Sequence, residues 1–189
     1  MGIHVPSGEE VADFLESGDA EALSESCNLV THFSEDVTLK VMRGPARKKF
    51  ARREEEQAAY FRAQGIRVPE IYDVVKLRKL EKEKRSEELK GTSKKPWVVI
   101  MERIHGQIFS KLKKKKARKA APALEDLLEQ LEVLPVRLRQ GEHWHLSEIL
   151  LDPAGELHLL DFEMSKPGEE GDMKKIVKEL RRQYRILFE

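Results

Sequence analysis

The sequence predicts an α+β protein in two parts, in which a small antiparallel sheet with one long helix precedes a mostly helical part. Two runs rich in β-branched residues, 28–33 and 37–42, flank a short polar turn and indicate a β-hairpin. Farther along, leucines recur three and four residues apart between 123 and 138, which indicates an amphipathic helix that faces a core. We expect residues 1–101 to form the first part and residues 102–189 the second.

The first part is expected to contain two helices besides its strands. Ser7, followed by Glu10 three positions later, is a capping box and predicts a short amphipathic helix over 8–17. A long helix is expected over about 45–64, because a proline suits its first turn and a glycine its C-terminal cap. Extended segments are expected at 66–75 and 97–102, and the charged stretch between them, about 76–96, is expected to be a long mobile loop.

The second part is expected to begin and end with helices around a short hairpin. After Gly106 the pattern turns helical, with one segment that carries a run of lysines and another over 123–138. Two short apolar strands, 149–151 and 157–160, flank a turn-forming sequence and predict a hairpin. A last helix is expected over 172–188.

The charge and the cysteine content limit the classes of protein to which the chain can belong. Lys and Arg number 35 and Asp and Glu 34, so the formal net charge is +1 at pH 7. This density of charge argues against a membrane-spanning chain. Cys27 is the single cysteine, so no internal disulfide can form. We therefore expect a globular protein without a membrane span, in a reducing compartment such as the cytoplasm.

Basic residues are concentrated in one stretch of the chain. Residues 1–36 hold nine acidic residues and no Lys or Arg, whereas residues 76–119 hold seventeen basic and five acidic residues. The densest run is Lys111–Lys119, with seven Lys or Arg in nine positions. Such a run is typical of a solvated helix face or a loop, and it is also able to attract an anionic partner such as a nucleic acid or an anionic membrane. No aromatic residue interleaves the run to stack on bases.

One charged residue interrupts an apolar strand. Lys40 lies between two apolar residues, and a lysine on the inner face of a strand needs an anion. The following helix offers Glu54, which shares its face of the helix with apolar residues four and seven positions away. Glu55 and Glu56 are alternatives for a rotated helix. A further alternative is that Lys40 points to solvent from an edge strand.

A polar loop precedes the predicted hairpin of the second part. Glu142, His143, His145 and Glu148 lie within seven consecutive positions, and Asp161 follows the hairpin. Carboxylates and imidazoles in such an arrangement are able to surround a metal-bound phosphate. A polar surface loop with exposed histidines is the alternative. A zinc pair of His143 and His145 is disfavoured, because one residue separates them and no thiolate is near.

Taken together, these segments resemble the kinase-like fold, and most closely its aminoglycoside and small-molecule phosphotransferase branch. The run 26–33 is similar to the phosphate-covering hairpin, and 37–41 is similar to the strand with the ATP-anchoring lysine. The resemblance spans about residues 22–165. Further similar segments are 65–72, which follows the family's regulatory helix, 98–106, which corresponds to the hinge that holds adenine, and 145–152 with 159–163, which correspond to the catalytic loop and the metal-binding acid.

The resemblance implies a two-lobed protein with a truncated helical second lobe, ATP and Mg²⁺ or Mn²⁺ as cofactors, and a hydroxyl-bearing acceptor. In that family the strand lysine binds the α- and β-phosphates and a helix glutamate holds it, roles that fall to Lys40 and Glu54. The other implied residues are Asn28, Met101, Glu102 and Ile104 for the nucleotide, and Glu148 and Asp161 for the metal.

The sequence also departs from the family pattern. In the family's catalytic loop an aspartate accepts the substrate proton and an asparagine five residues later binds the second metal, but His143 and Glu148 stand at those positions. Glu148 is still an oxygen ligand. His143 or Glu142 is then the candidate proton acceptor near neutral pH. Room for one helix remains after Asp161, so we expect a minimal substrate platform.

These observations favour an atypical kinase that transfers the γ-phosphoryl group of ATP to a hydroxyl acceptor, either a protein or a small molecule. Phosphoryl transfer depends mainly on positioning and charge neutralisation, so a substituted proton acceptor need not abolish it. The second hypothesis is a pseudokinase that binds nucleotide or acts as a scaffold without transfer, because both catalytic-loop residues are substituted. The third is a basic module whose Lys111–Lys119 run binds RNA or an acidic partner.

Overall fold

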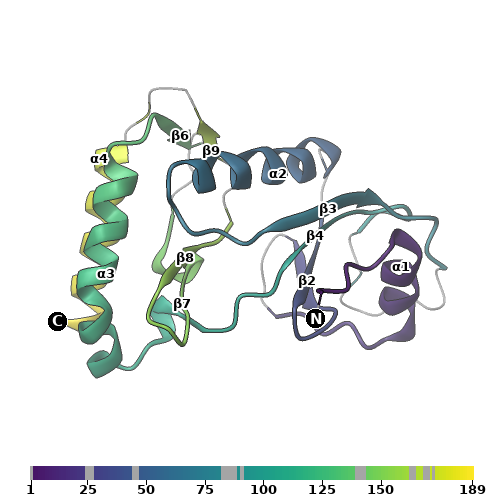
Figure 1. Ribbon diagram of the computed structural model, residues 1–189, viewed down its shortest axis with the longest axis horizontal. Helices are drawn as coiled ribbons and strands as arrows, with labels where there is room; N and C mark the ends of the chain where they lie inside the picture. The colour runs from purple at the N-terminus through teal and green to yellow at the C-terminus, as the bar shows by residue number, and fades with distance from the viewer. Residues whose placement is uncertain are drawn as a thin grey trace. The chain divides into compact units, whose positions relative to one another are not determined.

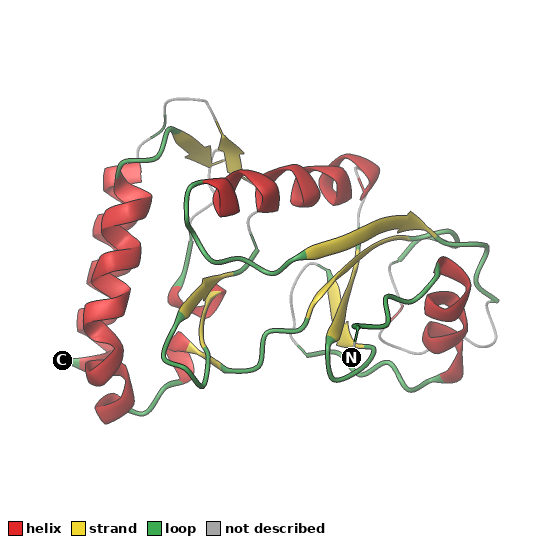
Figure 2. Ribbon diagram, in the orientation of Figure 1, coloured by secondary structure: helices red, strands yellow, loops and turns green. Residues whose placement is uncertain are grey.

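The chain is organised as two compact units. The computed structural model describes residues 2–23, 28–43, 47–81, 89, 92–138, 144–161, 165–167, 171 and 173–189. Unit 1 consists of Met1–Glu56 with Glu70–Arg103, and unit 2 consists of Gln57–Pro69 with Ile104–Glu189. Figure 1 labels the main helices and strands, and Figure 2 distinguishes them by type.

Unit 1 is built on a four-stranded antiparallel sheet with strand order β1-β2-β4-β3. The predicted hairpin and the predicted strand at 97–102 are present. Of the extended segment expected at 66–75, strand β3 covers only the part from 71 onward, and Pro69, which has no N–H for a sheet ladder, lies just before it. The strands are β1 (Leu29–His32), β2 (Val37–Val41), β3 (Ile71–Lys76) and β4 (Trp97–Glu102).

Two helices pack on the sheet of unit 1. Helix α1 (Gly8–Ser17) begins at the predicted capping box, in which the Ser7 N–H donates to Glu10 Oε2 at 2.8 Å. Helix α2 (Arg47–Ala63) follows β2, and its first half belongs to unit 1. Val37, Leu39 and Val41 of β2 share a buried cluster with α1, whereas Met42 shares one with Ala51 of α2. Successive residues of a strand point to opposite faces, so Lys40 lies on the α2 face of the sheet.

The stretch expected to be a long mobile loop is partly packed. Leu77 and Leu80, which follow β3, are buried in the cluster that contains α1. Their N–H groups donate to the carbonyls of Pro96 and Lys94, so backbone pairing continues past β3 and β4. Arg78 is hydrogen-bonded to Asp13 and Glu16 of α1, and these carboxylates raise the pKa of Arg78. Residues 82–88 and 90–91 of this stretch lie outside the described part of the chain.

Unit 2 combines short strands with two long helices. A three-stranded sheet has the order β5-β7-β8, and a separate two-stranded ladder joins β6 to β9. Helices α3 and α4 lie side by side (Figure 1), and Arg181 of α4 pairs with Glu125 and Glu132 of α3. The elements are β5 (Gln107–Ile108), α3 (Lys114–Glu132), β6 (Val136–Leu138), β7 (Ile149–Leu151), β8 (Leu157–Leu159), β9 (Ser165–Pro167) and α4 (Met173–Phe188), with 3-10 turns at η3 (Phe109–Lys111) and η4 (Leu146–Glu148). Within the described helices, no stretch is long and apolar enough to cross a membrane.

Two expectations for unit 2 are corrected. The two helical segments predicted after Gly106 are one helix, α3, which continues through Pro122 because buried Ala and Leu residues on both sides keep one apolar face. This helix ends at Glu132 instead of reaching 138, since Pro135 cannot continue it. Residues 136–138 form β6, whose partner β9 is far away in sequence and is invisible to a local pattern.

Gly106 allows a close backbone approach at the start of unit 2. A Cβ atom built on Gly106 would lie 2.5 Å from the carbonyl oxygen of Leu151 in β7. We expect Gly106→Ala to destabilise the fold by about 1–3 kcal/mol, as overpacking does in a core. Urea denaturation measures this, with Gly2→Ala as the control because no atom lies within 4 Å of its added Cβ. Equal stability of the two variants would contradict the expectation.

Candidate functional site

Lys40 and Glu54 form a buried ion pair in unit 1. Lys40 Nζ donates to Glu54 Oε2 at 3.0 Å, and the two side chains are 6% and 3% exposed. The neighbours of Lys40 on the adjacent strands are Val30 and Val99. The predicted pairing is therefore confirmed.

The alternatives for Lys40 are excluded by the rotation of α2. Glu55 accepts a hydrogen bond from Arg52 at 2.9 Å on the exposed side of the helix, and Glu56 is exposed. Lys40 does not point to solvent, because β2 is a central strand with all five residues buried. A buried ion pair adds little net stability over an apolar pair of the same volume, so stability alone does not account for it.

The residues predicted to contact nucleotide at the start of the chain and at the end of β4 take part in local packing. Asn28 is buried, and its Oδ1 accepts the Arg43 N–H at 3.0 Å. Met101 packs in the cluster on the α2 side of the sheet. Ile104 is half-buried and begins the second segment of unit 2. Their roles toward a nucleotide stay predictions.

Glu102, the last residue of β4, forms two hydrogen bonds with Glu70. Its N–H donates to the Glu70 carbonyl at 2.8 Å, and its Oε2 accepts the Glu70 N–H at 3.1 Å. Burial raises the pKa of the nearby Tyr72 hydroxyl, and the charges of Glu102, Glu70 and Asp36 raise it further. Arg103 donates to the Asp36 carbonyl, which ties this end of β4 to the β1–β2 turn. The end of β4, after which the chain passes to unit 2, is thus held by hydrogen bonds and lies near three carboxylates.

The hairpin of unit 2 brings Glu148 and Asp161 to the same end. Glu148 directly precedes β7 and Asp161 comes two residues after β8. The two strands pair in antiparallel register, and the Leu160 N–H donates to the Glu148 carbonyl at 2.7 Å. Two carboxylates at one end of a hairpin are oxygen donors of the kind that Mg²⁺ or Mn²⁺ prefers.

Asp161 has an unusual backbone conformation. Its φ is +53°, in the left-handed region, and it is the non-glycine residue with positive φ among the residues that the structure describes. Aspartate and asparagine tolerate this region better than other side chains, yet the conformation still costs free energy. Strained residues of this kind concentrate at functional sites, which makes Asp161 a candidate on geometric grounds.

Helix α4 supports the segment before β7, which sequence reasoning did not foresee. Gln183 Oε1 accepts the Leu146 N–H at 3.1 Å, and Gln183 Nε2 lies 3.3 Å from His145 Nδ1. Glu148 Oε2 in turn accepts the His145 N–H at 2.8 Å. Trp144 is buried against Phe61 at 5.8 Å between ring centroids, so it is a packing residue. No local sequence pattern predicts that a glutamine in the last helix contacts η4.

The remaining predicted catalytic residues, Glu142 and His143, lie outside the described residues. Among the residues that are described, no group of three or more His, Cys, Asp or Glu side chains converges on a possible metal position. Glu148 and Asp161 are therefore the described candidates for metal ligands, and their role as ligands stays a prediction.

The basic run Lys111–Lys119 is engaged with other parts of unit 2. Lys114 Nζ and Arg118 Nε donate to the carbonyls of Glu189 and Phe188, at the C-terminal end of α4. Cations at that end of a helix oppose its negative partial charge. Lys116 Nζ donates to Gln107 Oε1 at 2.8 Å. The run is thus an exposed helix face with structural contacts, and an anionic partner for it stays a prediction.

Comparison with known proteins identifies the fold. No family model matches the chain, and no curated protein matches its sequence. The aminoglycoside phosphotransferase APH(3'')-Id from Streptomyces rimosus is similar in structure, with a TM-score of 0.63 and 12% identity over 90% of this chain and 79% of that chain. The fold is kinase-like.

A second solved structure with this kinase-like fold supports the assignment. WbdD has a TM-score of 0.52 to this chain and 15% identity, over 85% of this chain and 36% of WbdD. A further structure of WbdD, with a kinase inhibitor, gives a TM-score of 0.50. The chain thus spans little more than a third of WbdD. At these identities the likeness concerns the fold alone.

The Lys40–Glu54 pair is open to a double-mutant test. We expect Lys40→Met and Glu54→Met each to lower the free energy of unfolding by about 3–5 kcal/mol, because each leaves one buried charge unpaired. The double variant should regain most of that loss, since both charges are removed together. Urea denaturation of the four proteins measures it. Additive losses in the double variant would show that the two side chains do not interact.

The turn of the β7–β8 hairpin has a pH-dependent contact. Burial raises the pKa of Asp152, but hydrogen bonds from the Glu156 N–H and from His158 outweigh burial and hold the pKa below its ordinary value. The ionised carboxylate therefore stabilises the folded hairpin above the unfolded-state pKa, and this contribution is lost as the pH falls through the folded-state pKa. We expect wild type to exceed Asp152→Asn in stability at neutral pH and the gap to close in strong acid. A gap that urea denaturation finds independent of pH would contradict this.

Proposed function

We propose that this chain is an atypical phosphotransferase that uses ATP and transfers its γ-phosphoryl group to a hydroxyl acceptor. The observation that carries the proposal is the buried Lys40–Glu54 pair on a kinase-like sheet and helix. It is supported by Asp161, whose left-handed backbone and acidic side chain lie where the resemblance calls for a metal-binding acid.

Lys40 is proposed to bind the α- and β-phosphates. Its ammonium is held in one position by Glu54 and by the strands on either side. A charge fixed in advance stabilises phosphate oxygens without a cost of reorganisation at the moment of reaction. Glu54 is a positioning residue in this scheme, because it acts through Lys40.

Asp161 and Glu148 are proposed to hold Mg²⁺ or Mn²⁺. The donor set fits, since both side chains are carboxylates and both belong to the same end of the β7–β8 hairpin. When bound, the metal supplies neutralisation of phosphate charge. Glu148 Oε2 already accepts the His145 N–H, which orients this carboxylate. His143 or Glu142 is proposed to accept the proton of the acceptor hydroxyl.

A pseudokinase is the second candidate, favoured by one observation. The position of the family's metal-binding asparagine is Glu148, and one of its oxygens is engaged with the backbone of η4. A chain of this kind binds nucleotide without transferring phosphate. In that case ATP with metal stabilises the protein, but a single-turnover assay finds no consumption of ATP above the uncatalysed background. His143→Ala then leaves the rate of ATP consumption unchanged.

The test is thermal stability with and without ATP and Mg²⁺ or Mn²⁺, in wild type and Asp161→Asn. Asparagine tolerates the left-handed backbone of residue 161 as aspartate does, so the variant removes charge and leaves the fold intact. Nucleotide at about 100 times its Kd adds about 2.7 kcal/mol, and each kcal/mol raises Tm by about 2–4 °C in a protein of this size.

We expect a metal-dependent rise in Tm for wild type that falls to less than half in Asp161→Asn. Glu156→Gln, an exposed carboxylate in the turn of the same hairpin, is the matched control and should keep the full rise. An absence of any shift at millimolar nucleotide would refute both nucleotide-binding hypotheses. An equal shift in the Asp161 variant would refute the assignment of the metal ligand.

A further inference from the structure

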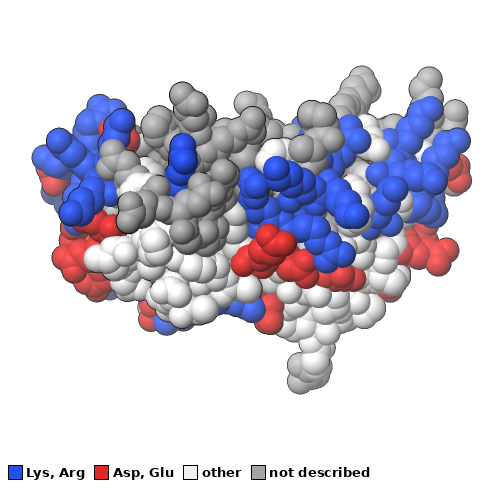
Figure 3. Space-filling view, turned by 90° about the horizontal axis from the view of Figure 1, so that it is seen from above, with Lys and Arg blue, Asp and Glu red and all other residues white. Residues whose placement is uncertain are grey.

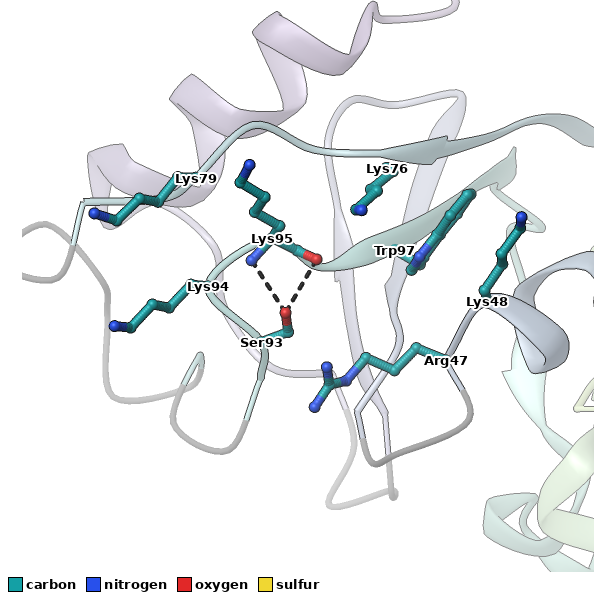
Figure 4. Close-up of a pocket in the computed structure, with 8 residues that line it drawn as sticks. All are labelled: Arg47, Lys48, Lys76, Lys79, Ser93, Lys94, Lys95 and Trp97. Carbon is teal, nitrogen blue, oxygen red and sulfur yellow. Dashed lines mark hydrogen bonds between the residues drawn. The ribbon is translucent and has the colours of Figure 1, made fainter.

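Unit 1 contains a second polar site, a pocket of about 460 Å³ that we call the cationic pocket. Its lining comes from three stretches of the chain: the start of α2, the end of β3 with the residues after it, and the residues that lead into β4 (Figure 4). Besides Ser93 and Trp97, every lining residue in the described part of the chain is Lys or Arg, and none of these lining residues is acidic. These cations are Arg47, Lys48, Lys76, Lys79, Lys94 and Lys95.

No carboxylate in the described part of the chain neutralises these cations. None of the ion pairs found there includes a lysine or arginine of the pocket. Lys48 Nζ instead lies 5.7 Å from the centre of the Trp97 ring, a cation–π contact. Six like charges around one hollow repel one another, and an anion between them relieves that repulsion.

The start of α2 reinforces the positive potential. Arg47 and Lys48 lie in the first turn of this helix, and that turn contains no acidic residue. The N-terminal end of a helix already has a positive partial charge, so cations there are unfavourable unless an anion is present. Arg47 Nε is buried and has no hydrogen-bond partner among the residues that the structure describes. Arg47 precedes Glu54 by seven residues, so the two lie on the same face of α2.

The pocket has a rigid frame. Lys76 of β3 pairs with Trp97 of β4 in the sheet. Ser93 Oγ accepts the Lys95 N–H and donates to the Lys95 carbonyl, both at 3.1 Å, and these bonds shape the turn that presents Lys94 and Lys95 (Figure 4). The Leu80 N–H donates to the Lys94 carbonyl and joins the two rims. The cations are thus presented by paired backbone.

We propose that the cationic pocket binds a compact anion with several phosphate groups, such as a polyphosphate or a polyphosphorylated small molecule. Its volume is within the range of small-molecule sites. Lysine ammonium groups and an arginine fork are the usual partners of phosphate oxygens. Figure 3, seen from above, shows how Lys and Arg gather on this side. A nucleic-acid strand fits less well, because the cations converge on one hollow and Lys48 covers the one aromatic ring.

The test is calorimetric titration of the whole chain with tripolyphosphate in the absence of divalent metal. Lys76→Gln/Lys95→Gln removes two exposed charges from the pocket, and Lys115→Gln/Lys119→Gln removes two from the exposed face of α3. We expect the pocket variant to bind at least tenfold more weakly and the α3 variant to bind within twofold of wild type. Equal losses in both variants would overturn the site in favour of diffuse attraction.

Three further experiments test where the ligand binds and which class of anion it is. Binding should change tryptophan fluorescence, and Trp97→Phe should abolish that change while calorimetry still detects the ligand, because the only other tryptophan, Trp144, is buried in unit 2. Inositol hexakisphosphate in place of tripolyphosphate distinguishes a phosphorylated ring from a linear chain. A single-stranded RNA that binds the same pocket more tightly than either would overturn the proposal.

The site is independent of the proposed kinase function. Asp161→Asn should bind tripolyphosphate within twofold of wild type, since Asp161 is not among the lining residues of the pocket. A loss of tripolyphosphate binding in Asp161→Asn as large as the loss in the pocket variant would overturn a separate site. Failure of the metal-dependent ATP shift with intact tripolyphosphate binding would refute the kinase proposal alone.

Discussion

The buried ion pair between Lys40 and Glu54 is the constraint on which unit 1 depends. Helix α2 is rich in charged residues and has few apolar contacts with the sheet, chiefly through Ala51 and Phe50. Apolar packing alone therefore specifies its rotation weakly. A buried ammonium on the central strand accepts only a rotation that brings a carboxylate to it, because an unpaired charge in that position costs several kcal/mol. The pair is thus compatible with the rotation of α2 that turns Glu54 toward the sheet.

The same rotation explains why α2 carries two different kinds of site. With Glu54 turned toward the sheet, Arg47 is turned inward two helical turns earlier, about 10 Å away along the axis. Its buried Nε then faces the region between the start of α2 and the β3–β4 ladder. At Glu54, α2 thus contributes a carboxylate that pairs with a cation. At Arg47 and Lys48, α2 contributes cations to a pocket that has no carboxylate among its described lining residues. The first arrangement pairs its two charges within the protein, whereas the second is the site proposed for a polyphosphate anion.

Several features were accessible to local reasoning because they depend on neighbours in sequence. The capping box of Ser7 and Glu10 is formed within one turn, and the β1–β2 and β7–β8 hairpins depend on short turns. Glu54 could be found from helical spacing once Lys40 had been recognised as a buried cation. The short strands β5, β6 and β9 were not predicted, because their partners lie far along the chain and, unlike β7 and β8, no short turn marks their pairing. For the same reason nothing marked Gln183 as the support of η4.

By itself, the sequence determined the class of fold, the order of the main elements and the candidates for the ion pair, since these follow from periodicity, caps and the cost of burying a charge. Only the tertiary structure decided that Glu54 rather than Glu55 or Glu56 faces Lys40, that Asp161 adopts a left-handed backbone and that six cations converge on one pocket. The ion pair and the pocket depend on the packing of α2 on the sheet and on the pairing of β3 with β4, which lie far apart in the chain. Pairing of that kind brings together residues whose separation along the chain carries no signal of their proximity.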